Sequence, residues 1–517
     1  MCGQGGAGGE LTVGEADELL SSLVDKSLLQ PLGDGTRLRM LETIREYGAE
    51  KLAGRGQVGE LRQRHAAHYT ALMREAAPKL LTRDQLNWLT RLRADRDNIL
   101  AALRYWCDTD DAGNALSLAI SLSIVALLLG NETDMAEWTG EALAISGEAD
   151  AGLRTVAEAL HVITSAMDPA ADGTGAAAYP RLTERLDAID IERYPVAGVL
   201  RPVYAMFAKD DKRLRGYLDQ ARAAGDEWLG ATAWLMTAGM AENYGNFDEM
   251  RSAAVEALDR FRALGERWGL SMALRTIGNI QVLDCDLDGA VAAFTEASHL
   301  LAEVGHREDL SQVQLRLAEI AARRGDLAKA RELSAAVRSA VESEGSPMDR
   351  GIAAAWWAAF EARWGDAGAA RPHQVAAERH LAQFGPAHPA RQHLEAMVAA
   401  TGARIAMADN DLRTAREQAV RSYRAAIAAE DMSLLAQASG TTAELALALG
   451  QPERAAELLG AGAVVRGADD PTDPTALQLV PLLRARLGDD RYEACYASGR
   501  ALARPDAIER LDPAGLG

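Results

Sequence analysis

The side chains of this sequence that could bind a metal ion are mainly histidines, and their spacing does not form a ligand set. His65 and His68 are three residues apart and would share one face of a helix, but no carboxylate or cysteine lies at the spacing of a helical zinc site. Four further histidines lie within residues 373–393, where prolines interrupt the chain, and nothing in the sequence fixes them on one face. The sequence therefore predicts no metal site.

Motifs for catalysis and for phosphate binding are also missing. The sequence holds no Gly-x-Ser-x-Gly elbow and no Gly-x-x-x-x-Gly-Lys-Ser/Thr phosphate loop. Residues 3–8 match Gly-x-Gly-x-x-Gly, but that motif binds a dinucleotide only between a strand and a helix, and the sequence offers no such strand. The four cysteines are dispersed along the chain. We therefore expect no enzyme activity, no catalytic residue and no bound cofactor.

Charge and hydropathy exclude further classes of protein. The chain has 75 acidic and 55 basic side chains, a formal net charge of −20, which argues against a surface coated by nucleic acid. The longest apolar run, Leu116 to Leu129, is shorter than the roughly 18 residues of a membrane span. The N-terminus lacks the basic start and apolar centre of a secretory signal. We expect a cytoplasmic chain without contact to a membrane.

Internal repetition is the strongest structural signal in the sequence. Turn residues recur at intervals of 40, mostly before an aspartate or asparagine: Gly245, Cys285, Gly325 and Gly365, resuming at Asn410 and Gly450. A second series with the same interval lies between them: Gly265, Gly305, Gly345 and Gly385. A small residue repeats as Ala290, Ala330 and Ala370, then as Ala415 and Ala455, and a bulky residue repeats as Ile277, Leu317, Trp357 and Met397. Four series in step indicate a structural unit of about 40 residues.

Each unit predicts two helices joined by a tight turn. Glycine suits the left-handed residue after a helix, and aspartate suits the N-cap of the next one. The alanines would let paired helices approach closely, and the bulky residues would fill the space between units. No unit can bury its apolar face alone, so neighbouring units must stack into a superhelix with a concave surface. The predicted fold class is all-α, a superhelix of helical hairpins that resembles the tetratricopeptide repeat family, whose usual unit is 34 residues.

The N-terminal region follows a different pattern. Residues 15–25 predict an amphipathic helix, and two short apolar runs at 27–32 and 36–40 flank a Gly-Asp-Gly turn that is typical of a hairpin. A further helix is predicted from Leu41 to Leu52. This order resembles the back half of a winged helix, so we expect a small, partial winged-helix module.

Several stretches resemble one family of regulators. They are "LLSSLVDKSLLQ", "RLRMLETIREYGAEKLA", "RHAAHYTALMREAAP", "LNWLTRLRADRDNILAALRYW", "AAELLGAGAVVRG" and "LGDDRYEACYASGRAL". In order and spacing they resemble the part that follows the nucleotide-binding module in bacterial signal-transduction ATPases with numerous domains, the antibiotic-regulatory and LuxR-type transcription regulators. The ATPase and DNA-binding modules of that family are absent from this sequence. The family's Met-His-Asp motif matches Met40, Leu41 and Glu42 here, and leucine cannot donate a hydrogen bond to a diphosphate.

The concave surface of the superhelix is the predicted ligand groove. Trp357 shares the register of the bulky series and should lie in the core, whereas its neighbour Trp356 is turned by about 100° around the helix axis. We therefore predict Trp356 as a groove residue, together with Arg275, Arg316 and Arg323. Solvated outer faces would explain the three arginines equally well.

These patterns divide the chain into four predicted segments. A partial winged-helix module with a flexible Gly-rich tail occupies residues 1–53, and linker helices follow at 54–111. The superhelix extends over 112–465, and a C-terminal capping segment over 466–517. The chain could also form a homo-oligomer.

The resemblance implies a regulatory, effector-sensing arm of a bacterial transcription regulator. Such an arm binds a small molecule, a peptide or a protein partner in the concave groove and has no catalysis of its own. A plain protein-interaction scaffold is one alternative, and a winged-helix DNA-binding protein is another. Arg37 and Arg39 could reach phosphates, but the helix at 15–25 carries four acidic and no basic side chains, so we do not expect direct contact with nucleic acid.

Overall fold

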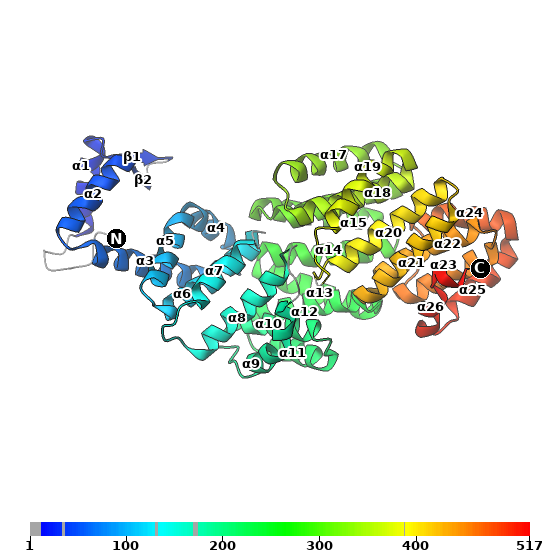
Figure 1. Ribbon diagram of the computed structural model, residues 1–517, viewed down its shortest axis with the longest axis horizontal. Coiled ribbons are helices and arrows are strands. Elements are labelled where there is room, and N and C mark those ends of the chain that lie inside the picture. The colour runs from blue at the N-terminus through cyan, green and yellow to red at the C-terminus, as the bar shows by residue number, and fades with distance from the viewer. Residues whose placement is uncertain (1–11, 34–36, 130–132, 169–173, 387, 517) are drawn as a thin grey trace.

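The computed structural model describes residues 12–33, 37–129, 133–168, 174–386 and 388–516. Within these residues the chain forms 26 α-helices and one two-stranded sheet, which confirms the predicted all-α class. Figure 1 shows an elongated molecule in which helices stack side by side, with the first elements projecting at one end. The predicted Gly-rich tail lies outside the described residues.

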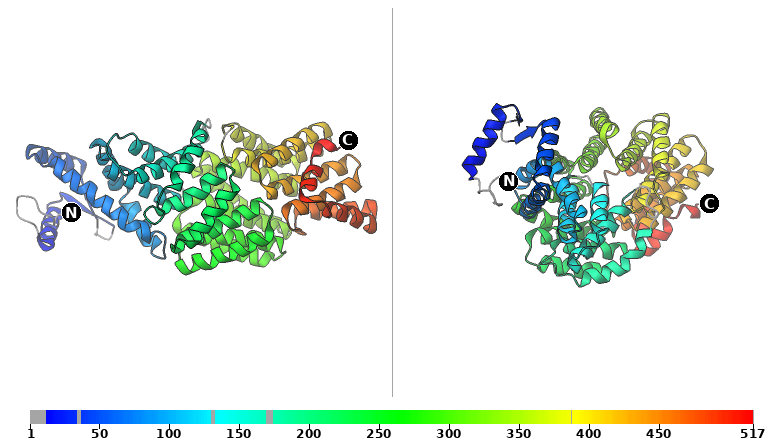
Figure 2. Two further views of the ribbon diagram at one scale, coloured as in Figure 1. Left: turned by 90° about the horizontal axis from the view of Figure 1, so that it is seen from below. Right: turned by 60° about the vertical axis from the view of Figure 1, so that its left-hand side comes forward.

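The N-terminal module has the predicted order of helix, hairpin and helix. Its elements are α1 (Val13–Asp25), β1 (Leu29–Leu32), β2 (Arg37–Met40) and α2 (Glu42–Gly54). Thr12 begins α1 with a capping box, because its hydroxyl accepts from the Glu15 amide while the Glu15 carboxylate accepts from the Thr12 amide. The strands are antiparallel, with Leu29 opposite Met40. Figure 2 shows that this module stands apart from the main stack.

The next helices form a bundle around one apolar helix. They are α3 (Val58–Lys79), α4 (Gln85–Ala94), α5 (Arg96–Asp108), α6 (Ala112–Leu129), α7 (Thr133–Leu143) and α8 (Ala151–Ala166). By length and composition α6 could cross a membrane, with a mean hydropathy of 2.0 over 18 residues, which corrects the shorter run expected from the sequence. However, 61% of α6 is buried, and it contacts α3, α5, α7 and α8, as the core helix of a bundle does.

Helix pairs follow in regular order. A less regular stretch comes first: η1 (Thr174–Ala178), α9 (Tyr179–Asp187), α10 (Pro195–Phe207) and α11 (Asp211–Ala223). The pairs are α12 (Glu227–Asn243) with α13 (Phe247–Leu264), α14 (Arg267–Leu283) with α15 (Leu287–Val304), α16 (Arg307–Arg323) with α17 (Leu327–Glu344), α18 (Pro347–Trp364) with α19 (Ala367–Leu381), α20 (Arg391–Ala408) with α21 (Leu412–Ala429), and α22 (Met432–Ala448) with α23 (Pro452–Arg466). The C-terminal elements are α24 (Pro474–Leu487), α25 (Asp489–Arg500), α26 (Arg504–Arg510) and η2 (Pro513–Gly515).

The turns within the pairs have the predicted caps. The second helix of five pairs begins at a side chain that accepts a hydrogen bond from the backbone amide three residues on: Asn246, Asp286, Asp326, Asp366 and Asp411. The preceding residue has positive φ at Gly245, Cys285, Gly325 and Asn410. Gly365, with φ −108°, departs from this pattern. The repeated Gly-Asp pattern therefore marks helix boundaries, as the sequence predicts.

The second glycine series is less uniform than predicted. Gly265 and Gly305 end their helices in the left-handed conformation, but Gly345 is extended. The next helix begins differently here: Pro347 disfavours helical dihedrals at Ser346, the residue before it, and Ser346 is extended and caps α18 through a capping box with Asp349.

The packing positions of the repeat are those that the sequence predicts. The five small residues of the alanine series, Ala290, Ala330, Ala370, Ala415 and Ala455, are fully buried. Trp357 is buried in the core, as expected. Ile277, Leu317 and Met397 are half-buried, and each packs against a cluster of buried apolar side chains. Complete burial of alanine lets paired helices approach closely, and the larger residues fill the space between units.

The superhelix returns to itself after one turn. Lys209, between α10 and α11, forms an ion pair with Glu430, which ends α21 and lies 221 residues further on. The buried His388 ring contacts the carbonyl oxygen of Met167 at 3.2 Å, again across 221 residues. The two further views in Figure 2 show the helices of the array curving round rather than running as a straight stack.

A backbone contact closes the same turn. Gly467 packs so close to Gly245 that a Cβ atom on Gly467 would lie 2.1 Å from the Gly245 carbonyl oxygen. Arg504 donates to the carbonyl oxygens of Tyr244 and Gly245 at 2.6 and 2.7 Å. The start and the end of the turn are therefore held together by direct hydrogen bonds and by glycines that leave no room for a side chain.

The linker helix α4 also docks on the array. Gln85 and Glu266 are both fully buried, and the Gln85 amide donates to the Glu266 carboxylate at 2.6 Å. Glu266 caps α14 by accepting from the amides of Trp268 and Gly269, and the Arg267 amide donates to the Gln85 side chain at 3.0 Å. Burial raises the pKa of Glu266, and the Gln85 amide counteracts that effect.

Replacing Gln85 should loosen this junction. In Gln85→Leu the Glu266 carboxylate loses a donor and the Arg267 amide loses its acceptor, which should cost about 1–3 kcal/mol of local stability. The measurement is hydrogen exchange of the amides at the start of α14, where faster exchange reports local opening. Gln63→Leu, at an exposed position of α3, is the matched control, and equal exchange in the two variants would contradict the interpretation.

Candidate functional site

The first helix of each pair contributes to one face of the superhelix. Neighbouring helices of this set, such as α18 with α20 and α20 with α22, contact one another. Near their C-terminal ends they carry Arg323, Arg363, Arg404 and Glu444, which are spaced at 40 or 41 residues. We call the side of these helices that the loop 467–473 contacts the inner face. Because the charged residues follow the repeat, they form a row along the inner face.

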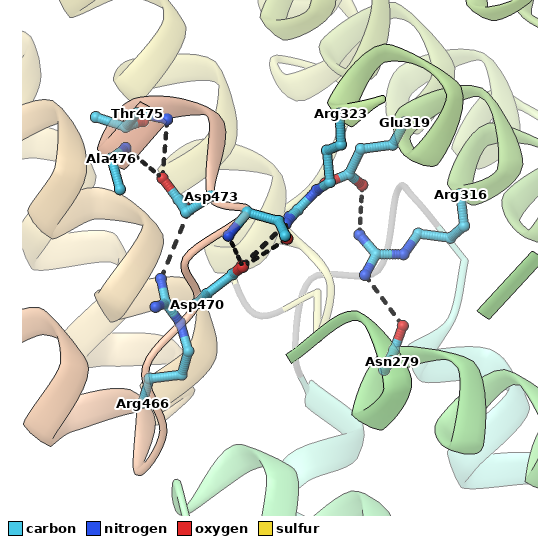
Figure 3. A network of polar contacts seen from close by, with 10 residues as sticks. Asn279, Arg316, Glu319, Arg323, Arg466, Asp470, Asp473, Thr475 and Ala476 are labelled. Atoms are coloured by element: carbon cyan, nitrogen blue, oxygen red, sulfur yellow. Dashed lines mark hydrogen bonds and ion pairs between the residues drawn. The ribbon is translucent and has the colours of Figure 1, made fainter. Parts of the chain in front are cut away.

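The loop 467–473, between α23 and α24, reaches this row at α16. Arg323 donates to both carboxylate oxygens of Asp470, at 3.2 and 3.0 Å, and to the Thr472 hydroxyl at 2.9 Å. The side chains of Arg323 and Asp470 are only 8% and 4% exposed. Figure 3 shows this contact bridging the two parts of the array. We call the contact between Arg323 and Asp470 the inner clasp.

A chain of polar contacts continues from the inner clasp across α16. Arg323 also bonds Glu319 on the same helix, at 2.8 Å, and Glu319 accepts from Arg316 at 2.5 Å. Arg316 then donates to Asn279 of α14 at 3.0 Å, and Asn279 donates to Glu242 of α12 at 3.2 Å. These contacts connect three successive inner-face helices to the C-terminal loop.

The protonation states in this chain follow from burial and from the arginines. Burial alone would raise the pKa of Glu319, but Arg316 and Arg323 hold it at about 2. The carboxylates Glu319 and Asp470 outweigh the burial of Arg323 and raise the pKa of its guanidinium. Burial raises the pKa of Glu242, although Arg316 and Arg275 oppose the change. Arg323 therefore enters the inner clasp as a charged guanidinium.

Further basic residues lie beyond the inner clasp. Arg404 pairs with Glu444 at 2.8 Å and lies 3.4 Å from the Thr475 hydroxyl of α24. Arg363 forms no ion pair with a described residue, and its buried Nε atom has no hydrogen-bond partner there. Burial and the neighbouring Arg404 lower the pKa of Arg363 to about 10. The carboxylates of Asp473, Glu444 and Glu319 lie near enough to Arg363 to oppose that decrease.

A cavity of about 490 Å³ lies on the other side of the same loop. Its walls come from α22, α23, α24, α25 and the loop 467–473, which contributes both Asp470 and Asp473. Asp473 caps α24 by accepting from the amides of Thr475 and Ala476. Burial opposes ionisation of Asp473, but Arg466 and two arginines of the inner face hold its pKa below the ordinary value. The loop thus separates the cavity from the inner clasp and takes part in both.

The structure brings some of the predicted groove residues together and separates others. Arg316 and Arg323 belong to the chain of contacts on α16, while Arg275 lies beside Asp309 at 3.7 Å. Trp356 is half-buried and stacks on Phe360, with ring centroids 5.1 Å apart. None of these residues lines the cavity.

Sequence reasoning missed several members of the site. Arg363 lies 40 residues after Arg323, and Arg404 lies 41 residues after Arg363, so both would have been found by extending the register of the repeat. Asp470 and Asp473 lie in a Pro/Asp-rich loop, and no periodic signal connects that loop to α16. Only the curvature of the whole array brings them to Arg323.

The histidines are distributed over separate contacts. His65 lies 3.4 Å from the Asn98 side chain, whereas His393 faces Asp431 at 3.4 Å. Within the described ranges, no group of three or more histidine, cysteine, aspartate or glutamate side chains is placed to hold a metal ion.

Acid should destabilise the folded chain by protonating the Glu319 carboxylate, which then loses its interactions with Arg316 and Arg323. A pKa of about 2 against an ordinary 4.5 corresponds to roughly 3 kcal/mol in favour of the ionised form. We expect Glu319→Gln to lose that amount at pH 7. Because the pKa is depressed in the folded chain, the stabilisation is complete above pH 4.5 and disappears as the pH falls towards 2.

The measurement compares urea-unfolding midpoints of wild type and Glu319→Gln from pH 7 down to pH 3. The stability difference between wild type and Glu319→Gln should fall to about half of its pH 7 value near pH 3. Glu332→Gln, an exposed glutamate on α17, is the matched control and should cost less than about 0.5 kcal/mol at every pH. A difference that stays constant with pH would show that Glu319 is not held ionised by these arginines.

Comparison with known proteins gives a distant relationship over nearly the whole chain. No protein-family profile matches the sequence. Proteins named "Putative HTH-type transcriptional regulator" from Mycobacterium bovis and from two strains of Mycobacterium tuberculosis are 26% identical over 562 aligned positions. The alignments cover 97% of this chain and 62% of each relative.

Solved structures give weaker likenesses. A signal transduction ATPase with numerous domains that carries a tetratricopeptide repeat sensor, from Pyrococcus horikoshii, is 13% identical, with a TM-score of 0.34 over 92% of this chain and 60% of that one. Yeast Tom70 is 10% identical, with a TM-score of 0.38 over 87% of this chain and 99% of that one. Superpositions at these scores do not assign a function. The sequence alignments show that this chain is distantly related to HTH-type transcriptional regulators and spans about 62% of their length.

Proposed function

We propose that this chain is the regulatory arm of a bacterial transcription regulator, which senses an effector or a protein partner and performs no catalysis. The distant relationship to HTH-type transcriptional regulators over 97% of the chain supports the regulatory role. The observation that carries the sensing role is the inner clasp, because it joins two segments 147 residues apart through one buried ion pair. A contact of this kind has two discrete states, made and broken, and a ligand that prefers one state shifts the equilibrium.

A contiguous set of contacts supports transmission from the inner clasp to the linker. Arg316 of α16 holds Asn279 of α14, and α14 begins at Glu266, which binds Gln85 of the linker helix α4. A displacement of α16 relative to α14 would therefore act on the junction that positions the linker.

An observation on the N-terminal module favours the scaffold alternative as a second role. Large apolar side chains of this module are between 36% and 59% exposed: Leu19, Leu32, Leu38, Met40, Leu41 and Tyr47. The helix α2 buries none of its residues. Exposed apolar side chains that lie close together are typical of surfaces that bind another protein. A scaffold of this kind would bind its partner without any change at the inner clasp.

The DNA-binding alternative has less support. Arg37, which the sequence offered as a phosphate contact, bonds the Asp95 carboxylate at 2.5 Å and the Ala94 carbonyl oxygen at 2.7 Å. Arg39 is exposed, but one exposed arginine beside an acidic helix gives little attraction for a phosphate backbone.

The test is a thermal-shift screen of the full chain against small molecules and peptides. An effector present at about 100 times its Kd should stabilise the chain by about 2.7 kcal/mol. Asp470→Asn removes the carboxylate charge that faces Arg323 in the inner clasp. The affinity for the effector should therefore change by at least about fivefold. Asp259→Asn, at an exposed position of α13, is the matched control and should leave the affinity unchanged.

Three results would contradict the proposal. An effector that binds wild type and Asp470→Asn equally would exclude the inner clasp as the sensing element. A stable protein partner without any effector would favour the scaffold. Retardation of DNA that weakens steeply with salt would favour the winged-helix alternative.

A further inference from the structure

The cavity beside the loop 467–473 has walls suited to an apolar molecule. The helices α22 and α23 line it with small residues, among them Ala436 and Ala463. Larger apolar side chains line it as well, among them Leu459 of α23 and Val480 of α24. At about 490 Å³, the volume lies within the range of small-molecule sites.

An aromatic pair forms one end of this cavity. Tyr492 and Tyr496, both on α25, stack with ring centroids 6.0 Å apart. The Tyr496 hydroxyl donates to Asp469 at 2.7 Å, which fixes its orientation. Both rings line the cavity, but Arg484 lies over the Tyr492 ring at 4.7 Å and the Tyr496 hydroxyl is already engaged.

The carboxylates of the wall already have partners. Asp469 accepts from Tyr496 and lies 3.5 Å from Arg500, and Asp470 is held by Arg323. Asp473 accepts two backbone amides at the start of α24. A ligand that carried a positive charge would have to displace one of these interactions, so the wall does not favour a cation.

Arg466 is the charged side chain of the wall with donors to spare. Its side chain is 15% exposed, and its partner among the described residues, Asp473, lies 3.7 Å away, which is beyond hydrogen-bond distance. A guanidinium presents five N–H donors in a planar fork that matches a carboxylate. A carboxylate in the cavity would satisfy donors that the protein leaves unpaired.

We propose that this cavity binds an amphipathic carboxylic acid, with its carboxylate on Arg466 and its apolar body between α22, α23 and α24. The inference rests on the proposed regulatory function and names the effector class. Because the loop 467–473 supplies Asp470 to the inner clasp and Asp473 to the cavity wall, an occupant on Arg466 acts on the same loop that holds Arg323. The effector and the inner clasp are thereby coupled.

The experiment uses octanoate, octan-1-ol and octylamine, which share one alkyl chain and differ in charge. Isothermal titration calorimetry on the full chain should show that octanoate binds at least about tenfold more tightly than the alcohol or the amine, because only octanoate pairs with the fork. Arg466→Gln should weaken octanoate at least about tenfold and leave octan-1-ol unchanged, which shows that the cavity remains intact. Arg413→Gln, on an arginine whose side chain is 77% exposed, should bind octanoate as wild type does.

A second variant tests the position of the site independently of charge. Ala476 lines the cavity on α24, so Ala476→Leu should fill part of it and weaken octanoate and octan-1-ol together. Equal binding of octanoate and octylamine, or unchanged octanoate binding in Arg466→Gln or Ala476→Leu, would overturn the assignment.

Hydrogen exchange separates this inference from the proposed function. Octanoate should change amide exchange in the loop 467–473 and at the C-terminal end of α16. Binding without that change would uphold the site and contradict the sensing role of the inner clasp. An effector from the thermal-shift screen that does not compete with octanoate would uphold the sensing role and contradict this site.

Discussion

The ion pair between Arg323 and Asp470 is the constraint on which the inner face depends. Two charges that are almost completely removed from water are costly unless every hydrogen-bonding position is filled. Here Arg323 is also held by Glu319 and Thr472, and the Thr472 amide donates to Asp470 at 3.0 Å. Such a fully partnered pair adds little net stability, but it penalises every arrangement in which the loop 467–473 lies elsewhere. We interpret the inner clasp as fixing one arrangement of the turn.

This constraint matters because the array is a nearest-neighbour structure. Each helix pair packs mainly on the next, and a small rotation at each junction accumulates along the chain. Over the 221 residues that separate Lys209 from Glu430, slight changes at several junctions would displace one end from the other. Contacts across the turn therefore respond to the geometry of all units between them. A ligand bound at one of these contacts can influence helices that it does not touch.

The polar side chains of the loop 467–473 serve two places, because some take part in the inner clasp and others line the cavity. The carboxylate of Asp470 points to α16, whereas Asp473 begins α24 and faces Arg466 across the cavity wall. Most charged groups in this region are matched by opposite charges or by backbone amides. Among the described residues of this region, Arg363 forms no ion pair, and Arg466 lies 3.7 Å from Asp473 without a hydrogen bond to it.

The sequence alone determined the unit and its internal geometry. Glycine and aspartate at intervals of 40 set the turns, because a left-handed residue and an N-cap are local requirements of a few consecutive residues. It also placed Trp357 in the core and identified the helix, hairpin and helix of the N-terminal module. Arg316 and Arg323 were candidate groove residues from the sequence, without a periodic argument that singled them out.

Only the tertiary structure decided which units meet across the superhelical turn. The partner of Arg323 is 147 residues away, and that of Gln85 is 181 residues away. Neither pairing follows from a periodic pattern, because both depend on the summed rotation of all intervening helix pairs. A local signal fixes where each helix begins and ends, but the small angles between successive pairs arise from side-chain packing. Those angles, added over one turn, bring Asp470 to Arg323 and leave the cavity open beside it.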